Sequence, residues 1–245
     1  MLAAAPSLTI VIPVLNEAER LPRLLRQLAG ARERGSEVVV VDGGSTDGTV
    51  ELAEVAGVTV IRAERGRARQ LQAGVDASHG EALWLLHADS LIDPMSDQHI
   101  VWGLADSGRL WGRFSIRLSG SHPLLRVVER GMNLRSRLSG IATGDQGIFV
   151  ERSALARIGG IPDQPLMEDV ELSLRLKEIC PPLCLLKRVT TSSRRWERHG
   201  VVRTILFMWR LRFAYAFGAA PEVLARRYQG NPPVRDDVLQ PETAR

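Results

Sequence analysis

Short apolar runs alternate with segments of helical spacing through the first half of the chain. The runs are rich in aliphatic and β-branched side chains, which is typical of buried strands, and they cover residues 8–15, 37–41, 58–61 and 82–86. The segments with apolar positions at helical spacing are 17–28, 46–56 and 67–77. Strands that alternate with helices predict a single α/β domain with a mostly parallel central sheet, flanked by helices.

The second half of the chain is less regular. Residues 111–118 alternate between apolar and polar, which favours a strand at the edge of a sheet. Further helices and strands are expected at 124–138, 147–150, 168–179 and 183–189. No repeat or linker divides the chain, so we expect one domain over residues 1–228. The polar, proline-containing residues 229–245 are typical of a loose tail.

Residues 201–220 form the one segment that invites a membrane assignment. Arg203, Arg210 and Arg212 interrupt it, and each central arginine costs about 2.5–3.5 kcal/mol on insertion scales. The segment is therefore not expected to span a bilayer. A helix packed on the domain is the main prediction, and a position at a membrane surface is the alternative because aromatic residues stand among the arginines.

Composition narrows the class of protein. An apolar fraction of 44% and a charged fraction of 24% are those of a folded globular chain. The net charge of +4 is too small to indicate nucleic acid as a partner. Cys180 and Cys184 are expected to be structural thiols rather than half a zinc site, because no second Cys/His pair follows. With no signal-peptide pattern in the first six residues, we expect a cytoplasmic protein.

Each of the four predicted strands in the first half ends in a polar cluster. The clusters are Asn16-Glu17, Asp42, Arg65-Gly66-Arg67 and His87-Ala88-Asp89. Open α/β sheets bind ligands outside the carboxyl ends of their strands. The sequence therefore predicts a ligand site at this edge.

The octapeptide Asp42-Gly43-Gly44-Ser45-Thr46-Asp47-Gly48-Thr49 follows a β-branched run. Ser45 or Thr46 is expected to cap the next helix, with Asp47 in its first turn. The glycines let a flat ligand approach the backbone, and the carboxylate that opens the octapeptide can accept hydrogen bonds from a base or ribose. An ordinary strand–turn–helix corner is the alternative.

Several motifs occur in an order that resembles the family-2 glycosyltransferases of GT-A fold. They are Pro13-Val14-Leu15-Asn16-Glu17, the Asp42 octapeptide, Asp89 after the fourth strand, and Glu168-Asp169. Three further phrases resemble a compact bacterial branch of that family: Gly66-Arg67-Ala68-Arg69-Gln70-Leu71, Leu86-His87-Ala88-Asp89-Ser90 and Gly144-Asp145-Gln146-Gly147. The resemblance covers residues 7–228.

The resemblance implies an inverting transfer of a sugar from a nucleotide-diphosphate sugar to an acceptor hydroxyl, assisted by a divalent cation. The implied nucleotide- and donor-binding residues are Pro13, Asn16, Glu17, Asp42, Gly43, Ser45, Arg67, Gln70 and Asp89. Of the arginines after the third strand, Arg67 is assigned to the phosphates. It adjoins Gly66, and Arg69 cannot share its helix face.

The implied metal ligands are Asp89, His87 and His199, and the implied cofactor is Mn²⁺ or Mg²⁺. Asp89 resembles the last acid of the family's Asp-x-Asp motif, and His87 replaces the first acid. On an extended strand these two side chains would face the same side. Imidazole suits Mn²⁺ better than Mg²⁺, so the replacement shifts the expected metal preference. Hydrogen-bonded or surface histidines are the alternative for His87 and His199.

The resemblance assigns the general base to Asp169, preceded by Glu168. A carboxylate at a helix N-terminus is held as an anion, ready to accept a proton. Two acids that merely complement the helix dipole are the alternative. The implied acceptor or sugar contacts are Asp145, Gln146, Arg195 and Trp196, and Trp196 fits a core position equally well.

Arginines and apolar residues of segment 124–138 suggest an acceptor-side helix. An amphiphilic acceptor and a peripheral contact with the inner face of a membrane fit this composition, and a solvated charged face is the alternative. Two other functions stay open: a sugar-phosphate nucleotidyltransferase and a non-catalytic nucleotide-sugar-binding protein. A dehydrogenase is disfavoured, because no Gly-x-Gly-x-x-Gly follows a strand.

Overall fold

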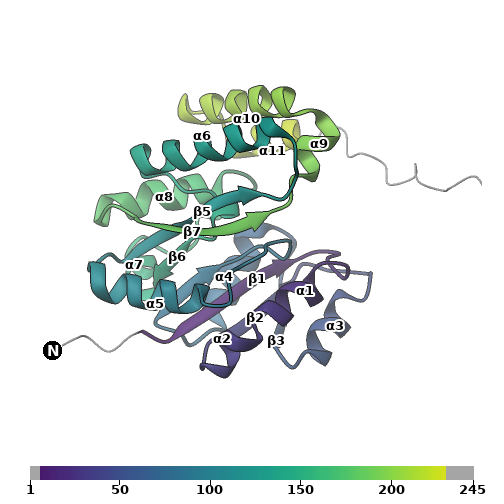
Figure 1. The fold of residues 1–245 in the computed structure, drawn as a ribbon, viewed down its shortest axis with the longest axis vertical. Coiled ribbons are helices and arrows are strands. Elements are labelled where there is room, and N and C mark those ends of the chain that lie inside the picture. The colour runs from purple at the N-terminus through teal and green to yellow at the C-terminus, as the bar shows by residue number, and fades with distance from the viewer. Residues whose placement is uncertain (1–5, 230–245) are drawn as a thin grey trace, which may run out of the picture.

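The computed structural model of the protein describes residues 6–229, without the side chains of Arg195 and Gln229. Within this range a sheet of seven strands, in the order β3-β2-β1-β4-β6-β5-β7, is flanked by helices (Figure 1). The strands are β1 (Leu8–Val14), β2 (Glu37–Asp42), β3 (Thr59–Arg62), β4 (Ala82–Leu85), β5 (Trp111–Leu118), β6 (Phe149–Glu151) and β7 (Leu183–Thr191). The helices are α1 (Leu21–Gln27), α2 (Ala29–Glu33), α3 (Thr49–Val55), α4 (Arg67–Asp76), α5 (Ser96–Ser107), α6 (Pro123–Ser139), the 3₁₀ turn η1 (Gly144–Gln146), α7 (Arg152–Arg157), α8 (Glu168–Ile179), α9 (Arg194–His199), α10 (Val201–Ala216) and α11 (Pro221–Gln229).

The sheet is mostly parallel, which confirms the predicted fold class. β1 pairs in parallel with β2 and β4, and β2 with β3, whereas β6 runs antiparallel to β4 and β5. The expectation that residues 111–118 form an edge strand is wrong, because β5 lies between β6 and β7. Its polar residues Arg113 and Ser115 are buried inside the protein, so the alternation does not mark a solvated face.

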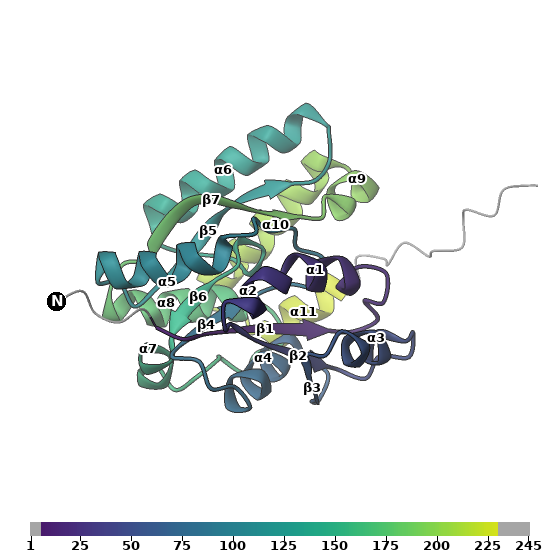
Figure 2. The ribbon, with the colours of Figure 1, turned by 60° about the horizontal axis from the view of Figure 1, so that its bottom comes forward.

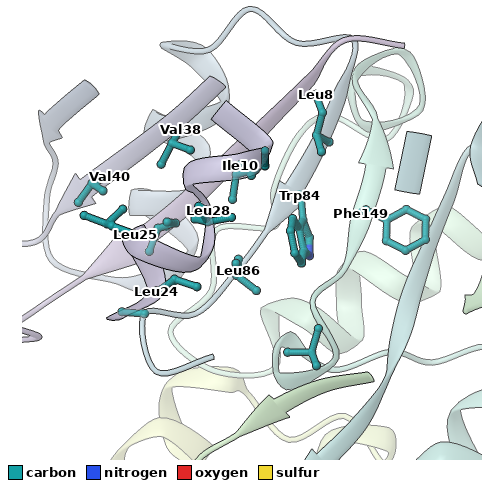
Figure 3. Close-up of a cluster of buried hydrophobic side chains, with 14 of the residues drawn as sticks. Leu8, Ile10, Leu24, Leu25, Leu28, Val38, Val40, Trp84, Leu86 and Phe149 are labelled. Atoms are coloured by element: carbon teal, nitrogen blue, oxygen red, sulfur yellow. The ribbon is translucent and has the colours of Figure 1, made fainter. Parts of the chain in front are cut away.

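The hydrophobic core lies on both faces of the sheet, because successive strand residues point to opposite sides. Ile10 and Val40 pack with α1 and α2 on one face, where Trp84 is also buried (Figure 3). Val11 and Val39 pack on the other face against α4. Figure 2 shows the first strands between these two helical layers. The carboxyl ends of β1, β2 and β4 thereby reach the same edge.

Two predicted helix starts lie too early. Residues 17–20 form a turn closed by the Leu21 N–H, which donates to the Glu17 carbonyl at 2.9 Å, and α1 begins only at Leu21. The next helix begins at Thr49 rather than Thr46. Asp47 precedes that helix and accepts the Thr49 N–H at 3.2 Å, so Asp47 performs the capping that was assigned to Ser45 or Thr46.

The segment expected to pack on the domain forms α10, which buries Val201, Thr204 and Leu211. Helices α2, α5, α7, α9 and α11 were not predicted. Because α11 extends to Gln229, the first residue of the predicted loose tail is helical, and residues 230–245 lie outside the described part. Over the described residues, no helix has the length and hydrophobicity that crossing a membrane requires.

Close packing of α4 on the sheet gives a test of the fold. A Cβ atom on Gly74 would lie 2.3 Å from Val11 Cγ1 and 2.9 Å from Val41 Cγ2. We expect Gly74→Ala to lower the free energy of unfolding by about 1–3 kcal/mol, measured by urea denaturation. Gly131→Ala in α6 is the control: its Cβ meets no described atom within 4 Å, so we expect unchanged or slightly higher stability. Equal midpoints for the two variants would contradict the packing.

Candidate active site

The loops that follow β1 and β2 are bonded to each other. Asn16 Oδ1 accepts the Thr46 N–H, and the Asn16 N–H donates to Ser45 Oγ, both at 2.9 Å. The Glu17 N–H donates to Thr49 Oγ1 at 2.9 Å. Asn16 adopts a left-handed backbone with φ 55°, which asparagine tolerates better than most residues. Residues from two predicted motifs thus form one fixed rim at the edge of the sheet.

Asp42 shapes the second of these loops from within. Its side chain is buried at the end of β2, where its two oxygens accept the Gly44 and Ser45 N–H groups at 3.0 Å each. A carboxylate engaged in this way stabilises the turn that the glycines make. Its contact with a base or ribose stays a prediction.

Gln70 joins α4 to the ends of two strands. Its Nε2 donates to the Val14 and Val41 carbonyls at 2.8 Å each, and the residue is buried. A Cβ on Gly43 would lie 3.0 Å from the Gln70 amide group. Pro13 is half-buried in β1, opposite Val41. Gln70 and Gly43 therefore hold the rim together, whatever contact they make with a donor.

Arg67 crosses from α4 to the second half of the chain. Its Nη1 donates to Glu168 Oε1 at 3.2 Å, in an ion pair whose guanidinium is 48% exposed and whose carboxylate is 7% exposed. Arg69 bonds instead to Glu64 and Asp163, at 2.6 and 3.3 Å. The two arginines thus separate onto different helix faces, as their spacing predicts.

Asp169 lies at the N-terminus of α8. Its Oδ2 accepts the Gly144 N–H and its Oδ1 accepts the Val170 N–H, both at 2.8 Å. Burial and, to a smaller extent, the charge of Glu168 raise the pKa of Asp169 to about 6. The two backbone hydrogen bonds and the charge of Arg67 lower it and only partly offset the rise. The carboxylate is therefore mostly ionised at neutral pH and still basic enough to take a proton.

A small cavity brings four of the predicted site residues together. Its volume is about 20 Å³, which is room for about one water molecule, and its polar lining comes from Arg67, His87, Glu168 and Asp169. His87 Nδ1 lies 3.4 Å from Asp145 Oδ1. The chain thus assembles the predicted base with a histidine and an arginine from three separate segments.

The geometry expected for His87 and Asp89 is wrong. β4 ends at Leu85, and the Ser90 N–H donates to the His87 carbonyl at 3.1 Å, so the motif is a turn and not an extended strand. Asp89 consequently lines a different cleft, of about 400 Å³, whereas His87 lines the small cavity. Two-residue periodicity does not apply to a turn.

Glu17 connects the cleft at Asp89 with the rim. Burial raises the pKa of Glu17, the 2.6 Å bond from Arg20 lowers it, and the nearby charges of Asp89 and Asp47 raise it again. These acids are therefore close enough to interact electrostatically. Asp89 lies at the same edge as the predicted nucleoside loops.

The three predicted metal ligands do not form a set. No group of three or more His, Cys, Asp or Glu residues among those described is arranged to hold an ion. His199 is the last residue of α9, a helix separate from the turn that carries His87. Asp89 alone fits a divalent cation through its hard oxygen donors, because Mg²⁺ and Mn²⁺ in such sites take one or two carboxylates and complete their shell with substrate phosphates and water.

The predicted acceptor contacts lie in different surroundings. Asp145 lies in η1 next to His87, at the small cavity. Gln146 is fully buried and its Oε1 accepts the Thr143 N–H at 3.1 Å, so the expected sugar contact is corrected to a loop-forming role. Trp196 packs against a core cluster with β5 and α6, which favours the core alternative. The side chain of Arg195 lies outside the described part.

Sequence reasoning did not single out Arg20 and Arg23 at the edge of the site, and it placed Arg135 only within the acceptor-side segment 124–138. Arg20, Arg23 and Arg194 line the cleft at Asp89. Arg135 of α6 carries two buried nitrogens, Nε and Nη2, without a partner among the described residues. Burial lowers the pKa of Arg135 and the charge of Asp169 raises it, which places the two groups within electrostatic reach. The sequence signal that could have identified Arg20 and Arg23 is their three-residue spacing directly after Asn16-Glu17.

Residues 9–124 match the family model described as Glycosyl transferase family 2. Over this stretch the chain is similar to the family 2 glycosyltransferases. A PGL/p-HBAD biosynthesis glycosyltransferase of Mycobacterium tuberculosis is 38% identical over 93 residues, which are 35% of this chain and 36% of that relative. The probable glycosyltransferase YdaM of Bacillus subtilis is 23% identical over 238 residues, which are 87% of this chain and 55% of that relative. The matched stretches thus cover about a third to a half of these relatives.

Solved glycosyltransferases share the fold of this domain. The mannosyltransferase PcManGT of Pyrobaculum calidifontis superposes with a TM-score of 0.64 at 22% identity, covering 94% of this chain and 72% of that chain. S. aureus TarS, residues 1–349, gives a TM-score of 0.65 at 16% identity, covering 76% and 60%. At these identities the likeness shows the fold alone, and it confirms the GT-A architecture.

The raised pKa of Asp169 has a consequence for stability. The folded protein holds this proton more tightly than the unfolded chain, so the carboxyl group favours folding most at low pH, and that contribution is lost as pH rises through about 6. Asp169→Asn does not titrate. We therefore expect the stability of the variant relative to the wild type to improve by about 1 kcal/mol between pH 5 and pH 8, measured by urea denaturation. A pH-independent difference would contradict the raised pKa.

Gly144 gives a second test of the site. A Cβ there would lie 2.7 Å from His87 Nε2, and the Gly144 N–H also holds Asp169. We expect Gly144→Ala to displace the imidazole while the fold persists, seen as a shifted His87 ring resonance in NMR with an unchanged far-UV CD spectrum. An unmoved His87 resonance would show that the contact is absent.

Proposed function

We propose that the protein is an inverting glycosyltransferase that moves a sugar from a nucleotide-diphosphate sugar to an acceptor hydroxyl. The observation that carries the proposal is the Asp169 carboxylate, which has a pKa of about 6 and lies beside Arg67 and His87 at the N-terminus of α8. A general base works best when its pKa lies near the operating pH. The family match favours this function over the nucleotidyltransferase and the non-catalytic alternatives.

The nucleotide-sugar donor is supported by the rim and by structural neighbours. TarS has been solved with UDP-GlcNAc, and PcManGT with GDP-Man and Mn²⁺. In this chain the rim formed by Asn16, Asp42 and Ser45 would hold the nucleoside, with Pro13 and Glu17 beside it. Arg67 retains a partly exposed guanidinium that can turn toward the diphosphate.

The reaction is a single displacement. The acceptor oxygen gives its proton to Asp169 and forms a bond to the anomeric carbon, while the bond from that carbon to the phosphate oxygen breaks and its electron pair leaves with the nucleoside diphosphate. Attack from the side opposite the leaving group inverts the anomeric centre. Arg67, whose side chain is partly exposed, stabilises the departing charge.

A divalent cation fits this site only together with the donor. Asp89 would hold it, and the ion would neutralise charge on the leaving diphosphate when bound. His87 lines the adjacent small cavity and bonds toward Asp145, so we assign it to the orientation of the sugar or of η1 rather than to the metal shell. The free thiols of Cys180 and Cys184 support a reducing compartment such as the cytoplasm.

A ligand screen and two substitutions test the proposal. The donor base is identified first, by a thermal-shift screen of nucleoside diphosphates with and without Mn²⁺. With the matching donor, Asp169→Asn is expected to lower sugar transfer about 10²- to 10⁴-fold, the usual contribution of a general base, and to leave the nucleotide-induced thermal shift in place. Asp89→Ala is expected to reduce the Mn²⁺-dependent part of that shift.

Asp106→Asn, at an exposed position in α5, is the matched control and should behave as the wild type. The configuration of the product, determined by NMR, should be opposite to that of the donor. Undiminished transfer by Asp169→Asn, or a product of retained configuration, would contradict the proposed mechanism.

A further inference from the structure

Helix α10 carries an exposed apolar stripe opposite its buried face. The stripe residues follow each other at helical spacing and are 57–88% exposed: Val202, Leu206, Trp209, Phe213 and Phe217. The buried face of the same helix contains Val201, Thr204 and Leu211. A helix that only packs on a domain needs one apolar stripe, and α10 has a second one that faces outward.

Helix α6 repeats this arrangement. Leu124, Val127, Leu134 and Leu138 are 41%, 63%, 58% and 78% exposed and lie at helical spacing. The opposite face buries Leu125 and Val128, among others. Two helices of one molecule thus present outward apolar stripes, whereas single exposed apolar residues elsewhere on a surface are ordinary.

The helices that carry the two stripes meet at one core cluster. The buried residues Leu125 and Val128 of α6 and Val201 of α10 share this cluster with Ile116 of β5. Figure 1 shows both helices at the same end of the protein, beyond β5 and β7. Leu211, farther along α10, belongs to a different cluster, so the helices meet at the start of α10 and each carries its stripe away from the core. We call the nine stripe residues the outer face.

The charges around the outer face are positive. Arg203 and Arg210 are exposed within the α10 stripe, and Arg130 and Arg137 within the α6 stripe. The α10 sequence contains no acid. The single acid of α6, Glu129, pairs with Arg126 at 2.8 Å. Arginines that alternate with Trp and Phe on a helix without an acid match the composition of helices that bind an anionic membrane surface.

We propose that the outer face binds the surface of an anionic membrane. The apolar side chains would enter the boundary between headgroups and acyl chains, and the arginines would contact the lipid phosphates. The inference deepens the proposed function, because an acceptor in that membrane would approach the site from α6, the helix that carries Arg135 near Asp169. Lipid binding itself does not depend on the transfer activity.

Vesicle sedimentation of the full chain tests the proposal. We expect the wild type to sediment with vesicles of equimolar phosphatidylcholine and phosphatidylglycerol, to sediment weakly with pure phosphatidylcholine, and to be released from the anionic vesicles by salt. The double variant Trp209→Ala with Phe213→Ala should lower the partition coefficient on the order of tenfold or more. Arg203→Gln with Arg210→Gln should lower it by roughly fivefold per arginine on anionic vesicles only.

Matched controls come from exposed residues on other helices. Trp102→Ala in α5 removes an indole that is 53% exposed, against 57% for Trp209. Arg157→Gln removes an exposed guanidinium of α7. Both variants should bind vesicles as the wild type does, and far-UV CD should show all variants folded.

Three outcomes would overturn the proposal: a wild type that stays in the supernatant with both kinds of vesicle, binding unchanged by the outer-face variants, or equal losses for the controls. If sedimentation velocity shows that Trp209→Ala with Phe213→Ala dissociates a dimer without changing vesicle binding, the outer face is an interface between copies of the chain and the proposal fails. Donor hydrolysis is measured in parallel without vesicles. Its absence in a wild type that binds vesicles would reject the proposed transfer and leave the membrane surface standing.

Discussion

The ion pair between Arg67 and Glu168 joins the two halves of this protein at the place where its chemistry is expected. Arg67 opens α4 in the first half of the chain, and Glu168 opens α8, 101 residues later. The pair sets two like charges, Glu168 and Asp169, side by side at one helix N-terminus and balances them with a single guanidinium. Arg67 thereby lies beside Asp169 at one small cavity, without help from a long continuous motif.

The same arrangement explains why Asp169 differs from an ordinary aspartate. Helix N-termini and backbone N–H groups normally stabilise a carboxylate, and Gly144 and Val170 supply such bonds here. Burial and the neighbouring Glu168 oppose them and raise the pKa of Asp169 to about 6. At neutral pH the ionised carboxylate is therefore held at a cost in stability, and shifted pKa values of this kind cluster at functional sites.

The first half of the architecture was predictable because each of its four strands is an apolar run followed by a polar cluster, and parallel strands bring those clusters to one edge. The family 2 assignment followed from the order of the motifs. The errors come from contacts distant in sequence or from local turns. Asp47 caps Thr49 because Gly48 intervenes, the turn from His87 to Ser90 separates His87 from Asp89, and burial turns Gln146 into a support of its own loop. The spacing of apolar residues carries no information about hydrogen bonds within turns. It also does not show whether a single polar side chain, such as that of Gln146, is buried.

The central claim is that Asp169 is the general base and that Glu168 raises its pKa. The most direct test compares the pH dependence of kcat/KM for sugar transfer between the wild type and Glu168→Gln. The wild type should lose activity as pH falls through about 6. Removing the Glu168 charge takes away a repulsion and frees Arg67, and both changes lower the pKa of Asp169, so the acidic limb should move to lower pH. An acidic limb that stays in place or moves upward would contradict the assignment of Asp169 as the base.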